Sequence, residues 1–151
     1  MTRINIIEPV QLTDQHLMAE YRELPMVHAS LRRSLRTKMT REVLAKVPKN
    51  YTLNAGHVTF FYDKMVYLRK RYDALIEELK TRGYNLDESR VLDESGIPAD
   101  FFKNEWMPGE DDLPIMQQRL QEKLKMKVHF YKYYGDGVWN GFYDNVSIWR
   151  P

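Results

Sequence analysis

The sequence predicts an all-α fold: a single compact domain of three main helices with long ordered loops and an aromatic C-terminal segment. Three stretches carry apolar residues at spacings of three and four, and no set of alternating strands is visible. The chain has 151 residues, 43% of them hydrophobic, which is enough for the core of one ordinary domain. We therefore expect one domain over residues 1–151.

The first helix is expected to begin at Thr13 or Asp14, because both side chains are good N-caps. Its apolar stripe comprises Leu17, Tyr21, Leu24, Leu31 and Leu35. Pro25 lies within this stripe. Since proline removes one backbone hydrogen bond, it should kink or divide the helix there.

Two further helices follow. The second is predicted over residues 58–82 and ends before Gly83, a typical residue just past a helix C-terminus. Its stripe comprises Phe61, Met65, Leu68, Tyr72, Leu75 and Leu79. The third is predicted to begin near Asp112, with Pro114 in its first turn and Met116, Leu120 and Leu124 on its apolar side.

The connections are long and irregular in composition. They cover residues 37–56, 83–111 and 128–151, and the last of these is rich in aromatic residues and glycine. Loops of this length are usually functional or packed by their own side chains. The chain has 19 aromatic residues, so such packing is feasible.

Charge is unevenly distributed along the chain. Residues 91–112 carry seven carboxylates and one lysine, whereas the rest of the chain is net basic. The densest basic stretch comprises Arg32, Arg33, Arg36, Lys38 and Arg41. A basic body with a separate acidic segment favours a polyanion partner such as nucleic acid, although a solvated helix face with salt bridges explains the pattern equally well.

Several classes of site are not predicted. The chain has no cysteine, which excludes disulfides, thiol catalysis and cysteine metal ligands. Its four histidines lack metal-ligand spacing, and no phosphate-binding glycine loop is present, so neither metal nor cofactor is expected. The absence of a membrane-length apolar run or a signal-peptide core favours a cytoplasmic location.

The N-terminal region holds the residues best suited to catalysis. His16 and Glu23 are seven residues apart and therefore share one helix face. The pattern alone favours a structural interpretation, in which His16 is a first-turn cap and Glu23 a solvated carboxylate. Removal of Met1 would leave a free α-amine on Thr2, with a pKa of about 7.7–8.0 that permits a neutral fraction near pH 7. A neutral amine beside a carboxylate is suited to imine chemistry at a sugar carbon.

Five stretches of the sequence resemble the bacteriophage pyrimidine-dimer DNA glycosylase/AP lyase family, also called endonuclease V. They are residues 1–5 (MTRIN), 14–25 (DQHLMAEYRELP), 56–64 (GHVTFFYDK), 68–71 (LRKR) and 130–135 (FYKYYG). The matches keep their order and spacing over residues 2–135. The resemblance implies a compact all-α domain, which agrees with the helix pattern.

The resemblance also implies a mechanism. The Thr2 α-amine would attack C1′ of the 5′ nucleotide of a pyrimidine dimer, displace the base and form a Schiff base. Glu23 would stabilise the positive sugar and assist removal of the C2′ proton, so that β-elimination nicks the abasic site. The implied activity is a bifunctional DNA N-glycosylase and abasic-site lyase, which acts as an endonuclease in DNA repair.

The implied partner is double-stranded DNA containing pyrimidine dimers or abasic sites, bound by a monomer. The resemblance places DNA-binding roles on Arg3, Gln15, His16, Arg22, Arg119, Lys123, Phe130, Tyr131 and Lys132, and the basic stretch adds Arg32 and Arg33. If the protein is phage-encoded, its location is the host cytoplasm or nucleoid.

The sequence departs from the family pattern in three places. Met26 stands where an arginine is familiar, and Phe130 where a tryptophan is familiar. Residues 136–151 form a C-terminal extension, in which Trp139, Phe142, Tyr143 and Trp149 are expected to pack on the core. Two alternatives stay open: a non-catalytic DNA-binding module on the same scaffold, and a glycosylase or lyase for a different pyrimidine lesion.

Overall fold

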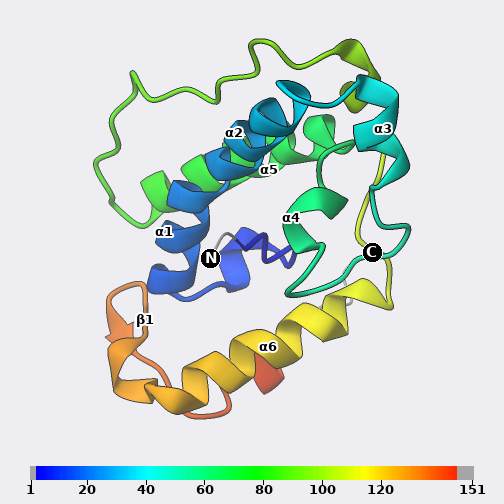
Figure 1. Ribbon diagram of the computed structural model, residues 1–151. Helices are drawn as coiled ribbons and strands as arrows, with labels where there is room; N and C mark the ends of the chain where they lie inside the picture. The colour runs from blue at the N-terminus through cyan, green and yellow to red at the C-terminus, as the bar shows by residue number, and fades with distance from the viewer. Residues whose placement is uncertain (1–2, 146–151) are drawn as a thin grey trace.

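The computed structural model describes residues 3–145 and contains six α-helices within them (Figure 1). These are α1 (Asp14–Glu23), α2 (Pro25–Leu35), α3 (Thr40–Ala45), α4 (His57–Phe60), α5 (Met65–Thr81) and α6 (Asp112–Met126). A two-stranded antiparallel hairpin follows, formed by β1 (Lys132–Tyr133) and β2 (Asp136–Gly137). The mostly helical fold class is confirmed, with the α1–α2 pair, α5 and α6 as its main helices.

The predicted division of the first helix at Pro25 is confirmed. Thr13 is the N-cap, and its hydroxyl accepts the His16 N–H at 3.2 Å. α1 ends at Glu23, and Pro25 is the first residue of α2, a position where the missing proline N–H breaks no helical hydrogen bond. The division leaves Glu23 at the end of one helix, immediately before the next.

The prediction of one helix over residues 58–82 is wrong at its N-terminal end. α4 stops at Phe60 and α5 starts only at Met65, because Phe60, Phe61 and Tyr62 are all buried and one helical stripe cannot bury three consecutive side chains. The buried Lys64 ammonium donates to the Phe60 carbonyl at 2.8 Å, which stabilises the break. The predicted end at Gly83 is confirmed: its φ is +94°.

The predicted loops contain more regular structure than expected. Residues 37–56 include α3, and short 3₁₀ turns occur in the other two loops at Ala99–Phe102, Val128–Phe130 and Phe142–Asn145. A further 3₁₀ turn, Pro9–Gln11, precedes α1. Residues 83–111 arch over α2 and α5 (Figure 1, light green). Arg32 and Arg69 hold this acidic loop through Asp93 and Glu94. No helix within residues 3–145 is long and apolar enough to cross a membrane.

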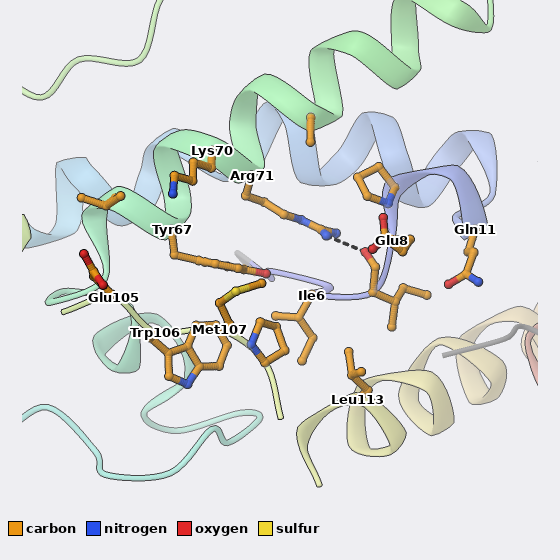
Figure 2. A pocket seen from close by; sticks show the side chains of 15 residues that line it. Ile6, Glu8, Gln11, Tyr67, Lys70, Arg71, Glu105, Trp106, Met107 and Leu113 are labelled. Atoms are coloured by element: carbon orange, nitrogen blue, oxygen red, sulfur yellow. Dashed lines mark hydrogen bonds between the residues drawn. The ribbon is translucent and has the colours of Figure 1, made fainter. Parts of the chain in front are cut away.

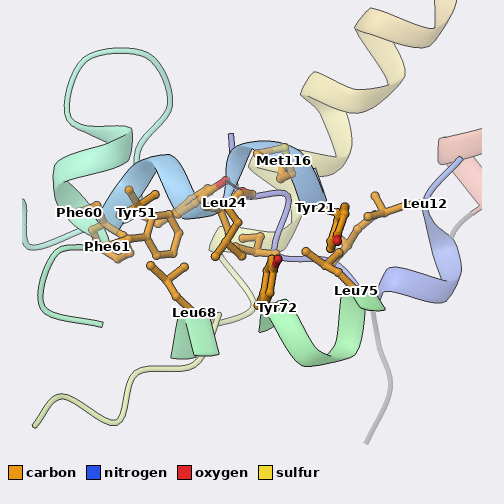
Figure 3. Close-up of a cluster of buried hydrophobic side chains, with 14 of the residues drawn as sticks. Leu12, Tyr21, Leu24, Tyr51, Phe60, Phe61, Leu68, Tyr72, Leu75 and Met116 are labelled. Carbon is orange, nitrogen blue, oxygen red and sulfur yellow. Dashed lines mark hydrogen bonds between the residues drawn. The ribbon is translucent and has the colours of Figure 1, made fainter. Parts of the chain in front are cut away.

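The core lies between α1, α2 and α5 and is closed by aromatic residues from the 51–61 region (Figure 3). Tyr21 and Tyr72 stack at 5.5 Å between ring centroids. The third helix is confirmed, since Met116, Leu120 and Leu124 of α6 are all buried.

The extension packs partly as expected. Phe142 and Tyr143 are buried against α6, where Gln117 donates to the Tyr143 carbonyl at 2.6 Å. The prediction that Trp139 packs on the core is wrong, because this residue is 57% exposed. Trp149 lies outside the described residues.

Candidate active site

The candidate site is built around the N-terminal segment, residues 3–7, which runs between α1 and α4 (Figure 1, dark blue). Ile4, Ile6 and Ile7 are buried, so this segment belongs to the core. Thr2, the predicted nucleophile, lies outside the described residues. Its neighbour Arg3 marks where the segment leaves the core.

Electrostatic interactions place several predicted residues around Arg3. Burial lowers the pKa of Arg3, the nearby Arg119 of α6 lowers it further, and the Glu23 carboxylate of α1 opposes both. Burial lowers the pKa of His16 to about 4, with further lowering by Arg3 and Lys123. The structure therefore brings together five predicted residues from the N-terminal segment, α1 and α6.

Gln15 and His16 are tied to the aromatic segment that follows α6. The Gln15 side-chain oxygen accepts the Lys132 backbone N–H at 2.8 Å. The His16 ring stacks on Tyr131 at 4.6 Å between centroids, and its Nδ1 lies 2.7 Å from the Tyr143 hydroxyl. Because His16 is neutral at pH 7, any contact it makes with a DNA phosphate is a hydrogen bond and not a charge pair.

Asp14 completes the attachment of the aromatic segment. Its carboxylate accepts the Tyr134 N–H at 3.1 Å and the Gly135 N–H at 2.9 Å, and it pairs with Arg82, the C-cap of α5, at 2.9 Å. The Arg82 guanidinium also lies over the rings of Tyr133 and Tyr134, at 4.8 and 4.7 Å. A buried charge network thus fixes the hairpin against α1.

The remaining predicted DNA contacts differ in their surroundings. Arg22, Arg33 and Lys123 are exposed, Lys132 is half-buried, and Phe130 is 58% exposed. Arg119 donates to the Asn54 side-chain oxygen at 3.3 Å. Arg32 instead donates to the Asp93 carbonyl at 2.8 Å, with the Asp93 carboxylate 3.7 Å away, so the acidic loop partly neutralises it.

Four residues that hold the N-terminal segment were not predicted. His57 accepts the Ile4 N–H at 2.9 Å, and the Tyr51 hydroxyl donates to the Ile4 carbonyl at 3.3 Å. Glu20 accepts the Asn5 N–H at 3.1 Å, and Arg71 donates to the Ile7 carbonyl. These contacts span 15 to 64 residues of sequence, so no local spacing reveals them.

A cavity of about 630 Å³ lies beside the N-terminal segment (Figure 2). Its walls include Ile6, Glu8, Tyr67, Arg71 and Trp106. Arg71 crosses this space toward the N-terminal segment, where its hydrogen bond is drawn. The cavity therefore borders the N-terminal segment at Ile6 and Ile7.

No metal site is found in the part of the chain that the structure describes: no three histidine or carboxylate side chains there could hold an ion together. The convergent groups are a carboxylate at Glu23 and cations at Arg3, Arg119 and Lys123. Such a set can bind a phosphate backbone and stabilise positive charge on a sugar.

Comparison with known families identifies a match to the N-terminal part of the chain. The family model described as pyrimidine dimer DNA glycosylase matches residues 1–91. The matched range contains the N-terminal segment, Glu23 and α1 to α5, including His57 and Arg71.

Proposed function

Because the chain belongs to the pyrimidine dimer DNA glycosylase family, it is a DNA-repair enzyme, and we propose that Thr2 and Glu23 carry out its chemistry. The observation that carries this proposal is the convergence of Arg3, Glu23 and Arg119 where the N-terminal segment leaves the core. The substrate is double-stranded DNA with pyrimidine dimers, and the lyase activity extends to abasic sites.

The glycosylase step begins at the neutral Thr2 amine. Its lone pair forms a bond to C1′ of the 5′ nucleotide of the dimer, and the C1′–N bond breaks with its electron pair going to the base, which takes up a proton. The new C1′–N⁺ centre loses a proton, and the C1′–O4′ bond then breaks with its electron pair going to O4′. O4′ takes up a proton, and the nitrogen gives up its remaining proton as the C1′=N bond of the imine forms. The Glu23 carboxylate stabilises the positive sugar while this charge develops.

The lyase step follows from the imine. Glu23 assists removal of a C2′ proton, and the electrons of the C2′–H bond form a C2′=C3′ double bond. The C3′–O bond then breaks, and the 3′ phosphate leaves with its electron pair. Water then hydrolyses the imine, restores the amine and releases an unsaturated aldehyde on the nicked strand. No metal or cofactor takes part in either step.

The cations around the site bind the duplex. Arg3, Arg22, Arg119 and Lys123 contact phosphates near the lesion, while Gln15, His16, Phe130, Tyr131 and Lys132 present polar and aromatic groups beside it. A kinked duplex with a flipped nucleotide would bring C1′ to the amine, a strategy common among enzymes that act on bases.

Borohydride trapping tests this function. Reduction during turnover on an abasic duplex should leave a stable protein–DNA adduct, and proteolysis should place it on the peptide beginning at Thr2. The reason is the pKa: an exposed lysine at about 10.4 is almost entirely protonated at pH 7, whereas an α-amine at about 7.7–8.0 is not. Strand cleavage should persist in excess EDTA.

Two variants sharpen the test. Glu23→Gln removes the charge and should slow adduct formation by about 10²-fold or more while duplex binding survives. Glu94→Gln, on the acidic loop, is the matched control and should keep the wild-type rate. Retention of Met1 should move the amine by about 3.5 Å and cost about 10²-fold or more. An adduct on Lys132, or full activity with Met1 retained, would contradict the assignment of Thr2.

A further inference from the structure

The N-terminal segment makes a strained turn just after the residues that lead to Thr2. Ile6 has a φ of +50°, and the Ile7 N–H closes a three-residue turn onto the Asn5 carbonyl. A positive φ is rare for a β-branched residue and persists only where the surroundings enforce it. The direction in which residues 3–5 run is therefore set by contacts with other elements.

A buried ion pair fixes both sides of this turn. Arg71 and Glu20 meet in two hydrogen bonds, 2.7 Å from Nε to Oε2 and 2.9 Å from Nη2 to Oε1. The same two side chains also bind the Asn5 N–H and the Ile7 carbonyl. Figure 2 shows Arg71 reaching this segment from α5. The turn is thereby fixed to α1 and α5, independently of the residues before Asn5.

His57 holds the chain on the side of the turn that leads to Thr2. Its Nδ1 lies 2.8 Å from the Thr52 carbonyl, an acceptor, so Nδ1 carries the proton and Nε2 is free to accept the Ile4 N–H. The side chain is 2% exposed. Burial lowers its pKa, with Arg3 and Arg119 lowering it further and the Thr52 hydrogen bond and Glu20 opposing them, so the ring is neutral at pH 7.

The backbone around His57 is itself rigid. Gly56 precedes it with a φ of +88°, and a Cβ at that position would lie 3.3 Å from the Pro48 side chain. Only glycine fits this left-handed, crowded position, so the start of α4 and the His57 ring are held in one place. His57 is thus a fixed acceptor for the N–H of Ile4, which lies two residues along the chain from Thr2.

We propose that His57 is a positioning residue that holds residues 2–4 by accepting the Ile4 N–H and so keeps the Thr2 amine at Glu23. The inference rests on the proposed function of Thr2. At most about 7 Å of extended chain separates Ile4 from Thr2, so freeing the Ile4 N–H would let the amine wander over a comparable distance. Displacement on a scale of 1 Å can cost about 10²-fold in rate.

Three variants test the proposal. His57→Leu keeps an apolar side chain but leaves the Ile4 N–H without its acceptor, whereas His57→Gln supplies a carbonyl oxygen that accepts and an amide that donates. His28→Leu is the matched control, since His28 is a buried histidine of α2 at 1% exposure with no hydrogen bond to the N-terminal segment. For each, we would measure the single-turnover rate of borohydride-trapped adduct, duplex affinity, and hydrogen exchange at the Ile4 amide.

The expected result has three parts. His57→Leu should slow adduct formation by about 10²-fold with unchanged duplex affinity, and Ile4 should exchange faster. His57→Gln should recover most of the rate, and His28→Leu should leave it unchanged. Equal losses in both leucine variants, or a wild-type rate in His57→Leu, would overturn the proposal. If the wild-type protein forms no adduct at Thr2, the proposed function fails instead, and unchanged Ile4 exchange in His57→Leu would still refute the contact.

Discussion

Helix α5 carries two arginine–glutamate pairs of the same chemistry in two different surroundings. Arg71 binds Glu20 on the inner face, where the two side chains are 5% and 0% exposed. Arg69 binds Glu94 of the acidic loop on the outer face, where they are 50% and 27% exposed. Both pairs are bidentate, with closest contacts of 2.7 and 2.9 Å.

The difference between these regions lies in what each pair holds. The inner pair also satisfies two backbone groups of the N-terminal segment, so the path toward Thr2 depends on it. The outer pair attaches a loop in water, where side-chain entropy and screening offset most of the attraction. Two arginines two residues apart therefore differ both in burial and in the backbone groups that their ion pairs hold, and we expect unequal effects when each is replaced.

The largest expected effect is on stability. Arg71→Met should lower the free energy of unfolding by about 3–5 kcal/mol, because it leaves the Glu20 carboxylate buried and unpaired. Arg69→Met, the same exchange on the outer face, should cost about 0–1 kcal/mol. Chemical denaturation of both variants measures the difference. Similar losses in the two would show that the inner pair is open to water.

The double variant Arg71→Met, Glu20→Leu refines this prediction. Removing both charges should recover part of the stability that Arg71→Met loses, since no carboxylate stays buried without its partner. The rate of adduct formation should not recover, because Asn5 and Ile7 have still lost their side-chain partners. If stability and the rate of adduct formation both recovered, the Arg71–Glu20 pair would not be needed to position the N-terminus.

The next effect concerns DNA binding. Arg119→Ala should weaken binding to an abasic duplex by about tenfold, or 1.4 kcal/mol, and lower the log–log salt slope by about 0.9. Arg32→Ala should change affinity less, since Asp93 already partly neutralises Arg32. Fluorescence anisotropy at several salt concentrations measures both. A larger loss at Arg32 would instead place the duplex along α2 and the acidic loop.

The smallest expected effect is a pH dependence of the free energy of unfolding, to which one histidine in each region contributes. Burial lowers the pKa of His16, near the inner segment, and of His28, beneath the outer loop, to about 4. Because the unfolded histidines titrate near 6.5, the unfolded chain binds more protons between about pH 4 and 6.5, and stability is lost as the pH falls through that window. At pH 6 the loss should be about 1 kcal/mol per histidine.

Thermal melts between pH 7.5 and 5.5 check this dependence. His28→Gln should remove the part of the pH dependence of stability that His28 causes and leave the part that His16 causes. A melting temperature that rises as the pH falls would contradict the depressed pKa values of both histidines.

Local signals in the sequence were sufficient for much of the fold. Thr13 caps α1, Pro25 divides the first helix and Gly83 ends α5, because capping, a missing N–H and a positive φ act within a few residues. The break at Lys64 was not predictable from spacing: the apolar stripe continues through it, and only the burial of three consecutive aromatics interrupts the helix.

The sequence by itself determined the family of the chain, and it predicted the chemistry of the candidate site: an amine at Thr2 and a carboxylate at Glu23. Only the tertiary structure decided how that site is held. His57 and Arg71 meet the N-terminal segment across 53 and 64 residues, and Arg71 is distinguished from Arg69 by its burial and by its contact with Ile7. The physical reason is that hydrogen bonds and ion pairs gain most of their effect from exclusion of water, which depends on packing among distant elements and leaves no trace in local spacing.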